Sequence, residues 1–147
     1  MDYKRIALAA VVAWVVDSAY GVIVWMKLLG GEFAKYPALF RPEADMNAHM
    51  PLAFAGSLLA MFALAAIYAK GYEGGKGVVE GIRFGLLMAL FTLGFVSIGL
   101  YASFNLGRRI ALMASAASFL EMIIVGAVIG LMYKPAVAAR TVRAAAM

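Results

Sequence analysis

The sequence has no cysteine, a single histidine and few charged residues. The absence of cysteine excludes disulfides, thiolate metal sites and thiol nucleophiles. A single histidine, His49, excludes a haem held by two histidines within one chain. Charged residues make up 14% of the 147 positions, against about 25% in soluble globular proteins. Without cysteine the redox compartment cannot be inferred. The low share of charged residues indicates a membrane protein.

Apolar residues are correspondingly abundant. They make up 65% of the chain, against roughly 45–50% in soluble domains. A soluble domain of this length could not bury so much apolar surface, whereas a lipid bilayer accepts it. The net charge of +5 is spread over helix ends and loops. We therefore expect contact with lipid headgroups and no nucleic-acid partner.

Four apolar stretches reach the roughly 20 residues that cross the hydrocarbon of a bilayer. The predicted spans are residues 6–29, 51–69, 84–106 and 110–133. The first run exceeds the apolar core of a signal peptide, about 7–15 residues, so we expect it to be a span. We place Pro51 at the start of the second span, where its missing N–H costs a helix nothing. The prediction is a single all-α domain, a polytopic membrane protein with four transmembrane helices in an antiparallel bundle.

The segments between the spans predict the topology. Residues 30–50 form the long outer loop, residues 107–109 a tight turn, and residues 134–147 a C-terminal tail. With the N-terminus inside, eight Lys and Arg residues lie on the inner side and five on the outer side. This bias favours both termini on the cytoplasmic side, although the Arg108–Arg109 pair on the outer side runs against it. The localisation we expect, in line with the family resemblance given below, is the bacterial inner (cytoplasmic) membrane.

Two acidic residues, Asp17 and Glu121, lie midway along the first and fourth spans. Carboxylates at this depth are costly and face a bundle interior or a watery cavity. Each lies on a helical stripe of small residues, which allow membrane helices to approach closely. The stripes are Ala10, Ala13, Asp17 and Gly21 on the first span, and Ala114, Ala117, Ser118 and Glu121 on the fourth. The other spans carry comparable faces: Ala53, Gly56, Ala60 and Ala63; Gly81, Gly85, Ala89 and Thr92.

The two acids are expected to belong to one polar interior. Its predicted members are Asp17, Ser18, Tyr20, Ser57, Thr92, Ser118 and Glu121. No basic residue lies near mid-depth, and two unpaired carboxylates in a low dielectric cannot both ionise cheaply, so we expect at least one to be protonated. Three roles stay open: hydrogen bonding between helices, a proton- or cation-linked function, and contact with a partner subunit or ligand.

A second candidate site surrounds the lone histidine. At helical spacing, Met46, His49 and Met50 would share one face, and thioether with imidazole ligands suits Cu(I). Pro51 disfavours helical geometry at Met50, which favours the simpler interpretation of an interfacial histidine. Haem or chlorophyll ligation by His49 stays open, and the sequence requires no cofactor.

Several features together resemble families of small bacterial four-helix membrane proteins without an assigned activity. They are Trp25 at the end of the first span, the long outer loop, the opening Gly81–Leu87 of the third helix, and the passage from Glu121 to Gly126–Gly130. The resemblance covers residues 6–133 and implies the architecture, but no functional residue. A more distant similarity is to four-helix sterol-isomerase-like proteins, none of whose motifs can be matched here residue by residue.

Three functions follow as hypotheses. The leading one is a non-enzymatic multi-pass protein, a homo-oligomer or an accessory subunit of a membrane complex, because small-residue stripes occur on every helix. The second is a proton- or cation-coupled transporter of a small solute that uses Asp17 and Glu121. The third is binding or isomerisation of a lipid, sterol or isoprenoid in an intramembrane cavity. No arrangement of serine, histidine and acid indicates a hydrolase.

Overall fold

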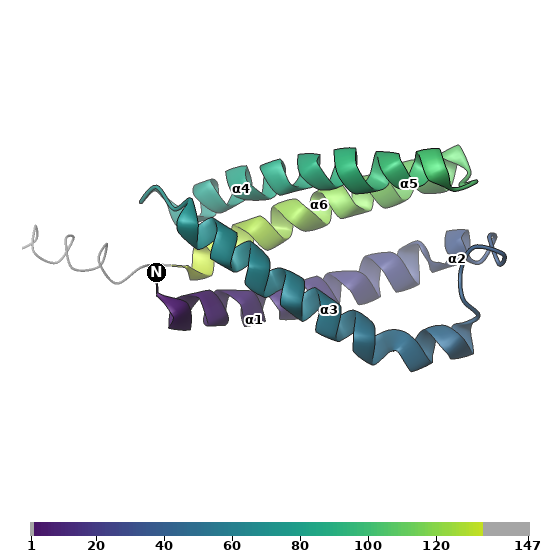
Figure 1. Ribbon diagram of the computed structural model, residues 1–147, viewed down its shortest axis with the longest axis horizontal. Helices are drawn as coiled ribbons and strands as arrows, with labels where there is room; N and C mark the ends of the chain where they lie inside the picture. The colour runs from purple at the N-terminus through teal and green to yellow at the C-terminus, as the bar shows by residue number, and fades with distance from the viewer. Residues whose placement is uncertain (1, 134–147) are drawn as a thin grey trace, which may run out of the picture.

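The computed structural model describes residues 2–133, which form four long helical segments and one short helix. In chain order they are α1 (Tyr3–Tyr20) continued by the π-helix η1 (Gly21–Leu28); α2 (Gly30–Phe33); α3 (Glu43–Lys70); α4 (Gly77–Thr92), η2 (Leu93–Ser97) and α5 (Ile98–Ser103); and α6 (Arg108–Met132). The long segments alternate in direction (Figure 1). All four are long and apolar enough to cross a membrane. The predicted all-α architecture of four antiparallel apolar helices is confirmed, and the protein is a small multi-pass membrane protein.

The long segments pack in the order α3–α1–α6–α4. The most extensive contact joins α4 to α6, and α1 touches both α3 and α6, whereas α3 and α6 barely meet. In Figure 1 α4 and α6 run side by side, while α3 crosses α1 and diverges from the other helices toward its Glu43 end. The assembly is therefore more open than a bundle in which all four long segments pack closely together.

The helices α4 and α6 touch through glycine. Gly77, Gly81 and Gly85 face Gly126 and Gly130, and a Cβ on Gly81 would overlap the carbonyl oxygen of Gly126. Membrane helices associate through van der Waals packing rather than the hydrophobic effect, so backbones that touch gain the most contact. The predicted small-residue face of the third span thus packs against α6.

The core lies where α1 crosses its neighbours. Ala9, Ala10 and Ala13 of α1 are fully buried, in one cluster with Ala65 of α3 and Ile129 of α6. Alanine at the crossing allows close approach of the helices. This part of the first predicted stripe is therefore a packing face, and Asp17 follows it one turn later.

The stripe on α3 behaves differently. Ala53, Gly56, Ala60 and Ala63 are all exposed, and a Cβ on Gly56 would have no atom within 4 Å. The buried residues of α3 are instead Met61, Ala65 and Tyr68 in its C-terminal half. This stripe therefore does not pack closely against another helix as the stripe of the third span does, because the buried residues of α3 lie in its C-terminal half, on a different face.

The helices extend beyond the predicted spans. The helix α3 begins at Glu43, with Pro42 as its N-cap and Glu43 and Asp45 in its first turn, where acidic side chains favour the helix dipole. Pro51 lies inside this helix, so its prediction as the first residue is wrong. Proline removes one backbone donor, and the eight residues that precede it still complete two turns. The predicted tail, residues 134–147, lies outside the described residues.

Candidate functional site

Asp17 and Glu121 come from different helices and line the same cavity. The cavity has a volume of about 250 Å³ and lies between α1 with η1, α3 and α6. We call it the carboxylate cavity. Its lining is mostly apolar, and the residues are Asp17, Ser18, Gly21, Val22, Trp25, Met26, Met50, Ala53, Phe54, Ser57 and Glu121. The two acids, which the sequence placed in one polar interior, therefore line the same space.

Glu121 is held by a tryptophan. The indole Nε1 of Trp25 donates to both carboxylate oxygens of Glu121, at 3.1 and 3.2 Å. Trp25 belongs to η1, the segment in which the first span changes from α- to π-helical geometry at Gly21. Such π-segments are rare and often coincide with functional positions. Through these two contacts η1 is joined to α6.

The outer segment covers Trp25. The ring of Trp25 stacks on Phe33 of α2 with centroids 6.1 Å apart, and Phe33 meets Phe40 edge-on at 4.9 Å. We call Trp25, Phe33 and Phe40 the aromatic cap. The aromatic cap connects the carboxylate of Glu121 to the segment that follows the first span. A displacement of this segment would therefore change the position of the Trp25 N–H relative to Glu121.

An acidic residue beside the cap ties the same segment to α6. Glu32 Oε1 lies 2.8 Å from Lys35 Nζ and 3.3 Å from Arg109 Nη2. The hydrogen bond from Lys35, assisted by the charge of Arg109, lowers the pKa of Glu32 below its ordinary value of 4.5, against a smaller opposing effect of desolvation. Glu32 is thus ionised at neutral pH and bridges two cations.

Asp17 has no such partner. Its half-buried carboxylate makes no hydrogen bond or ion pair with any of the described residues 2–133. The hydroxyl of Ser18 is buried and likewise lacks a hydrogen-bond partner there. Buried polar groups in proteins are nearly always satisfied, and the Ser18 hydroxyl is the one buried side-chain oxygen or nitrogen of residues 2–133 without a partner.

The other predicted polar residues divide into two groups. Ser57 lines the cavity, accepts from Trp14 Nε1 at 3.0 Å and donates to the Phe54 carbonyl at 3.2 Å. Tyr20 lies beside the cavity and donates to the Ala117 carbonyl at 2.7 Å, which pins α1 to α6. Thr92 and Ser118 do not line it, and the Thr92 hydroxyl donates to its own helix at Met88.

Sequence reasoning noted Trp25 only at the end of the first span and did not include it among the site residues. A signal was present, because Asp17, Gly21 and Trp25 recur every four residues. Extending the small-residue stripe by one turn would have placed Trp25 on the side of the acid. The hydrogen bond to Glu121, 96 residues away, cannot be predicted from the residues next to Trp25.

The predicted metal residues all lie in α3. His49 is exposed, and its Nδ1 lies 2.8 Å from the Asp45 carbonyl oxygen and 3.3 Å from Asp45 Oδ1. Met46 is also exposed, whereas Met50 lines the carboxylate cavity. Within residues 2–133 no three His, Cys, Asp or Glu side chains gather as a metal site would require. A site of Met46, His49 and Met50 stays a prediction.

Comparison with known proteins adds no family to these observations. The resemblance to families of small bacterial membrane proteins therefore stays a prediction beyond the four-helix membrane architecture itself. No protein-family model matches the chain, and no match is found among curated proteins or solved structures.

Proposed function

We propose that the protein binds a small organic cation in the carboxylate cavity and exchanges it for protons. The observation that carries the proposal is that Asp17 and Glu121, on separate helices, line one mostly apolar cavity within the membrane-spanning part of the chain. Ionisable groups at such depth are typical of ion and substrate paths.

The lining favours a cation with an apolar body. It contains two carboxylates and no Lys, Arg or His. The rings of Trp25 and Phe54 offer faces that attract cations. The volume of about 250 Å³ lies just below the range of pockets for drug-sized ligands, about 300–1,000 Å³. A quaternary ammonium or amine of about a dozen heavy atoms fits these properties.

Exchange with protons follows from the cost of charge at this depth. A carboxylate that loses its cation within the membrane is an uncompensated charge, which a proton neutralises. Cation and proton therefore compete for the same oxygens. Asp17 is the natural binding group because its oxygens are unpartnered, whereas Glu121 already accepts two contacts from Trp25.

The test uses purified protein in detergent with benzyltrimethylammonium as the probe. Titration calorimetry in two buffers of different ionisation enthalpy measures both the affinity and the protons released on binding. We expect binding with proton release in the wild type and its loss in Asp17→Asn and Glu121→Gln. Glu43→Gln, at the exposed start of α3, is the matched control and should bind normally.

Flux in proteoliposomes then separates binding from transport. We expect an imposed proton gradient to drive probe uptake in the wild type and in Glu43→Gln, but not in the two cavity variants. Unchanged uptake in both cavity variants would refute the proposal. Binding that needs neither carboxylate and releases no proton would instead favour a neutral lipid, sterol or isoprenoid in the same cavity.

A second candidate, a homo-oligomer or accessory subunit, is favoured by the exposed face of α3. Gly56, Ala60 and Ala63 form this face and are exposed, whereas Ala53 of the same stripe lines the carboxylate cavity. The chain lacks cysteine, so single cysteines report contact cleanly. We expect Ala60→Cys to form cross-linked dimers in membranes, and Ala55→Cys, which is also exposed but lies on a different face of α3, to form far fewer. Equal cross-linking at both positions would count against this candidate.

A further inference from the structure

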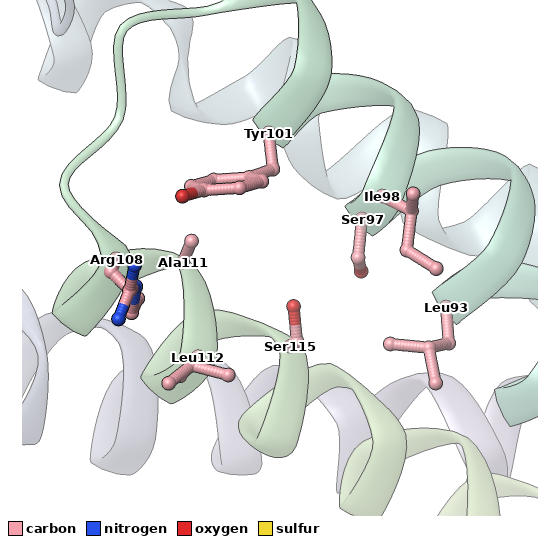
Figure 2. Close-up of a pocket in the computed structure, with 8 residues that line it drawn as sticks. All are labelled: Leu93, Ser97, Ile98, Tyr101, Arg108, Ala111, Leu112 and Ser115. Atoms are coloured by element: carbon pink, nitrogen blue, oxygen red, sulfur yellow. The ribbon is translucent and has the colours of Figure 1, made fainter.

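A second cavity lies apart from the carboxylate cavity, between η2 with α5 and the first half of α6. It has a volume of about 430 Å³ and shares no residue with the carboxylate cavity. Its lining, shown in Figure 2, consists of Leu93, Ser97, Ile98, Tyr101, Arg108, Ala111, Leu112 and Ser115. We call it the Arg108 groove.

The groove opens where the glycine contact ends. Gly81, Gly85 and Ala89 of α4 are buried against α6, but no residue of η2 or α5 is buried. The change to π-helical geometry at Leu93 alters the face that the helix presents to α6. The third and fourth spans therefore enclose space toward the turn that joins them.

One end of the groove is cationic. Arg108 stands at the first position of α6, at the end of the helix pair, and Tyr101 extends its ring across the gap with the hydroxyl on the side of Arg108 (Figure 2). The neighbouring Arg109 pairs with Glu32 at 3.3 Å. Arg108 has no acidic partner among the described residues, so its charge is available to an anion.

The other end of the groove is apolar except for two hydroxyls. Ser97 and Ser115 point toward each other across the gap, and neither hydroxyl makes a hydrogen bond within residues 2–133. Ser115 lies seven residues along α6 from Arg108, about 10 Å deeper by helical rise. Ile98 and Leu112 supply apolar walls between these polar levels, and Leu93 lies beyond Ser97, at the end away from Arg108 (Figure 2).

We propose that the Arg108 groove binds one anionic glycerophospholipid. Arg108 and Tyr101 hold its phosphate, the serine hydroxyls meet the ester region, and one acyl chain lies along Leu93 and Leu112. A cationic group at the end of the span and an apolar channel below it match the order of charge and hydrocarbon in such a lipid. This site is independent of the proposed cation exchange.

Native mass spectrometry of the detergent-purified chain tests the proposal. The protein is equilibrated with equal amounts of phosphatidylglycerol and phosphatidylcholine that carry identical acyl chains. We expect one retained phosphatidylglycerol, and an about fivefold weaker preference for it in Arg108→Gln. Arg83→Gln removes the same charge from exposed α4 at the opposite end of the helix pair and should leave the preference unchanged.

Two further arms test the acyl chain. Ser115→Leu fills the groove and should abolish retention of either lipid, while Ser115→Ala, which keeps the space, should lower it only in part. Glycerol 3-phosphate, which has the anion without the chain, should not displace the lipid. Displacement by it, an equal loss of preference in Arg83→Gln and Arg108→Gln, or retention of both lipids alike by the wild type would each overturn the proposal.

Discussion

Replacing Gly126 by alanine tests the contact in which the backbones of α4 and α6 touch. A Cβ added at Gly126 would lie 2.5 Å from both the carbonyl oxygen of Gly81 and the Cα of Gly85. Ordinary van der Waals contacts of a Cβ begin at 3.4 Å. Neither neighbouring atom belongs to a flexible side chain, so the helices must separate by about 0.9 Å, the difference between the two distances.

The free-energy cost follows from this separation. A gap of about 0.5–1 Å removes a quarter to a half of the dispersion energy of the atoms that face it. Overpacking of this kind costs about 1–3 kcal/mol. Alanine also favours a helix over glycine by about 1 kcal/mol, which would mask part of the cost. The comparison therefore needs a control that carries only the helix preference.

Gly56→Ala is that control, because a Cβ there would meet no atom within 4 Å. Both variants gain the same helix preference, so the difference in their free energies of unfolding isolates the steric cost. We expect Gly126→Ala to be about 1–3 kcal/mol less stable than Gly56→Ala. The measurement is loss of helical circular dichroism as dodecyl sulfate replaces a mild detergent. Equal stability of the two variants would refute the close α4–α6 contact.

Three further predictions concern the first span and the outer segment. The Lys35 hydrogen bond lowers the pKa of Glu32, so its ionised form stabilises the fold at neutral pH, and this stabilisation is lost progressively as the pH falls from 4.5 through the lowered pKa. The difference in melting temperature between wild type and Glu32→Gln should therefore narrow as the pH falls below 4.5, and a difference that does not change with pH would contradict the prediction. Trp14→Phe removes the indole N–H that donates from α1 to α3 and should lower the free energy of unfolding by about 1 kcal/mol in the same assay. An unchanged free energy of unfolding would contradict this prediction. Tyr20→Phe removes the bond to the Ala117 carbonyl and should speed backbone hydrogen exchange around Ala117, with unchanged exchange as the contrary result.

Much of the candidate site could be predicted from helical spacing. Asp17 and Glu121 were recognisable as interior residues, because charge at mid-span is costly and each lies on a small-residue stripe. Ser18 and Ser57 also line the cavity. The pairing of Trp25 with Glu121 could not be foreseen, since it depends on the π-helical geometry of η1 and on contact between distant segments.

Hydropathy by itself determined the number of long helices and their alternating direction. A run of about 20 apolar residues crosses a bilayer whatever its neighbours are, and short connections force antiparallel order. Helix ends were less well determined, as Pro51 shows, because tertiary context and capping decide where a helix starts.

Only the tertiary structure decided which small-residue stripes are used. The stripe of α4 meets Gly126 and Gly130, whereas the stripe around Gly56 stays exposed, although the two look alike in sequence. Periodicity identifies a face of one helix but carries no information about its partner. Which helix becomes the partner depends on how closely two backbones fit along their whole length. The carboxylate cavity and the Arg108 groove lie where the close packing of the helices ends.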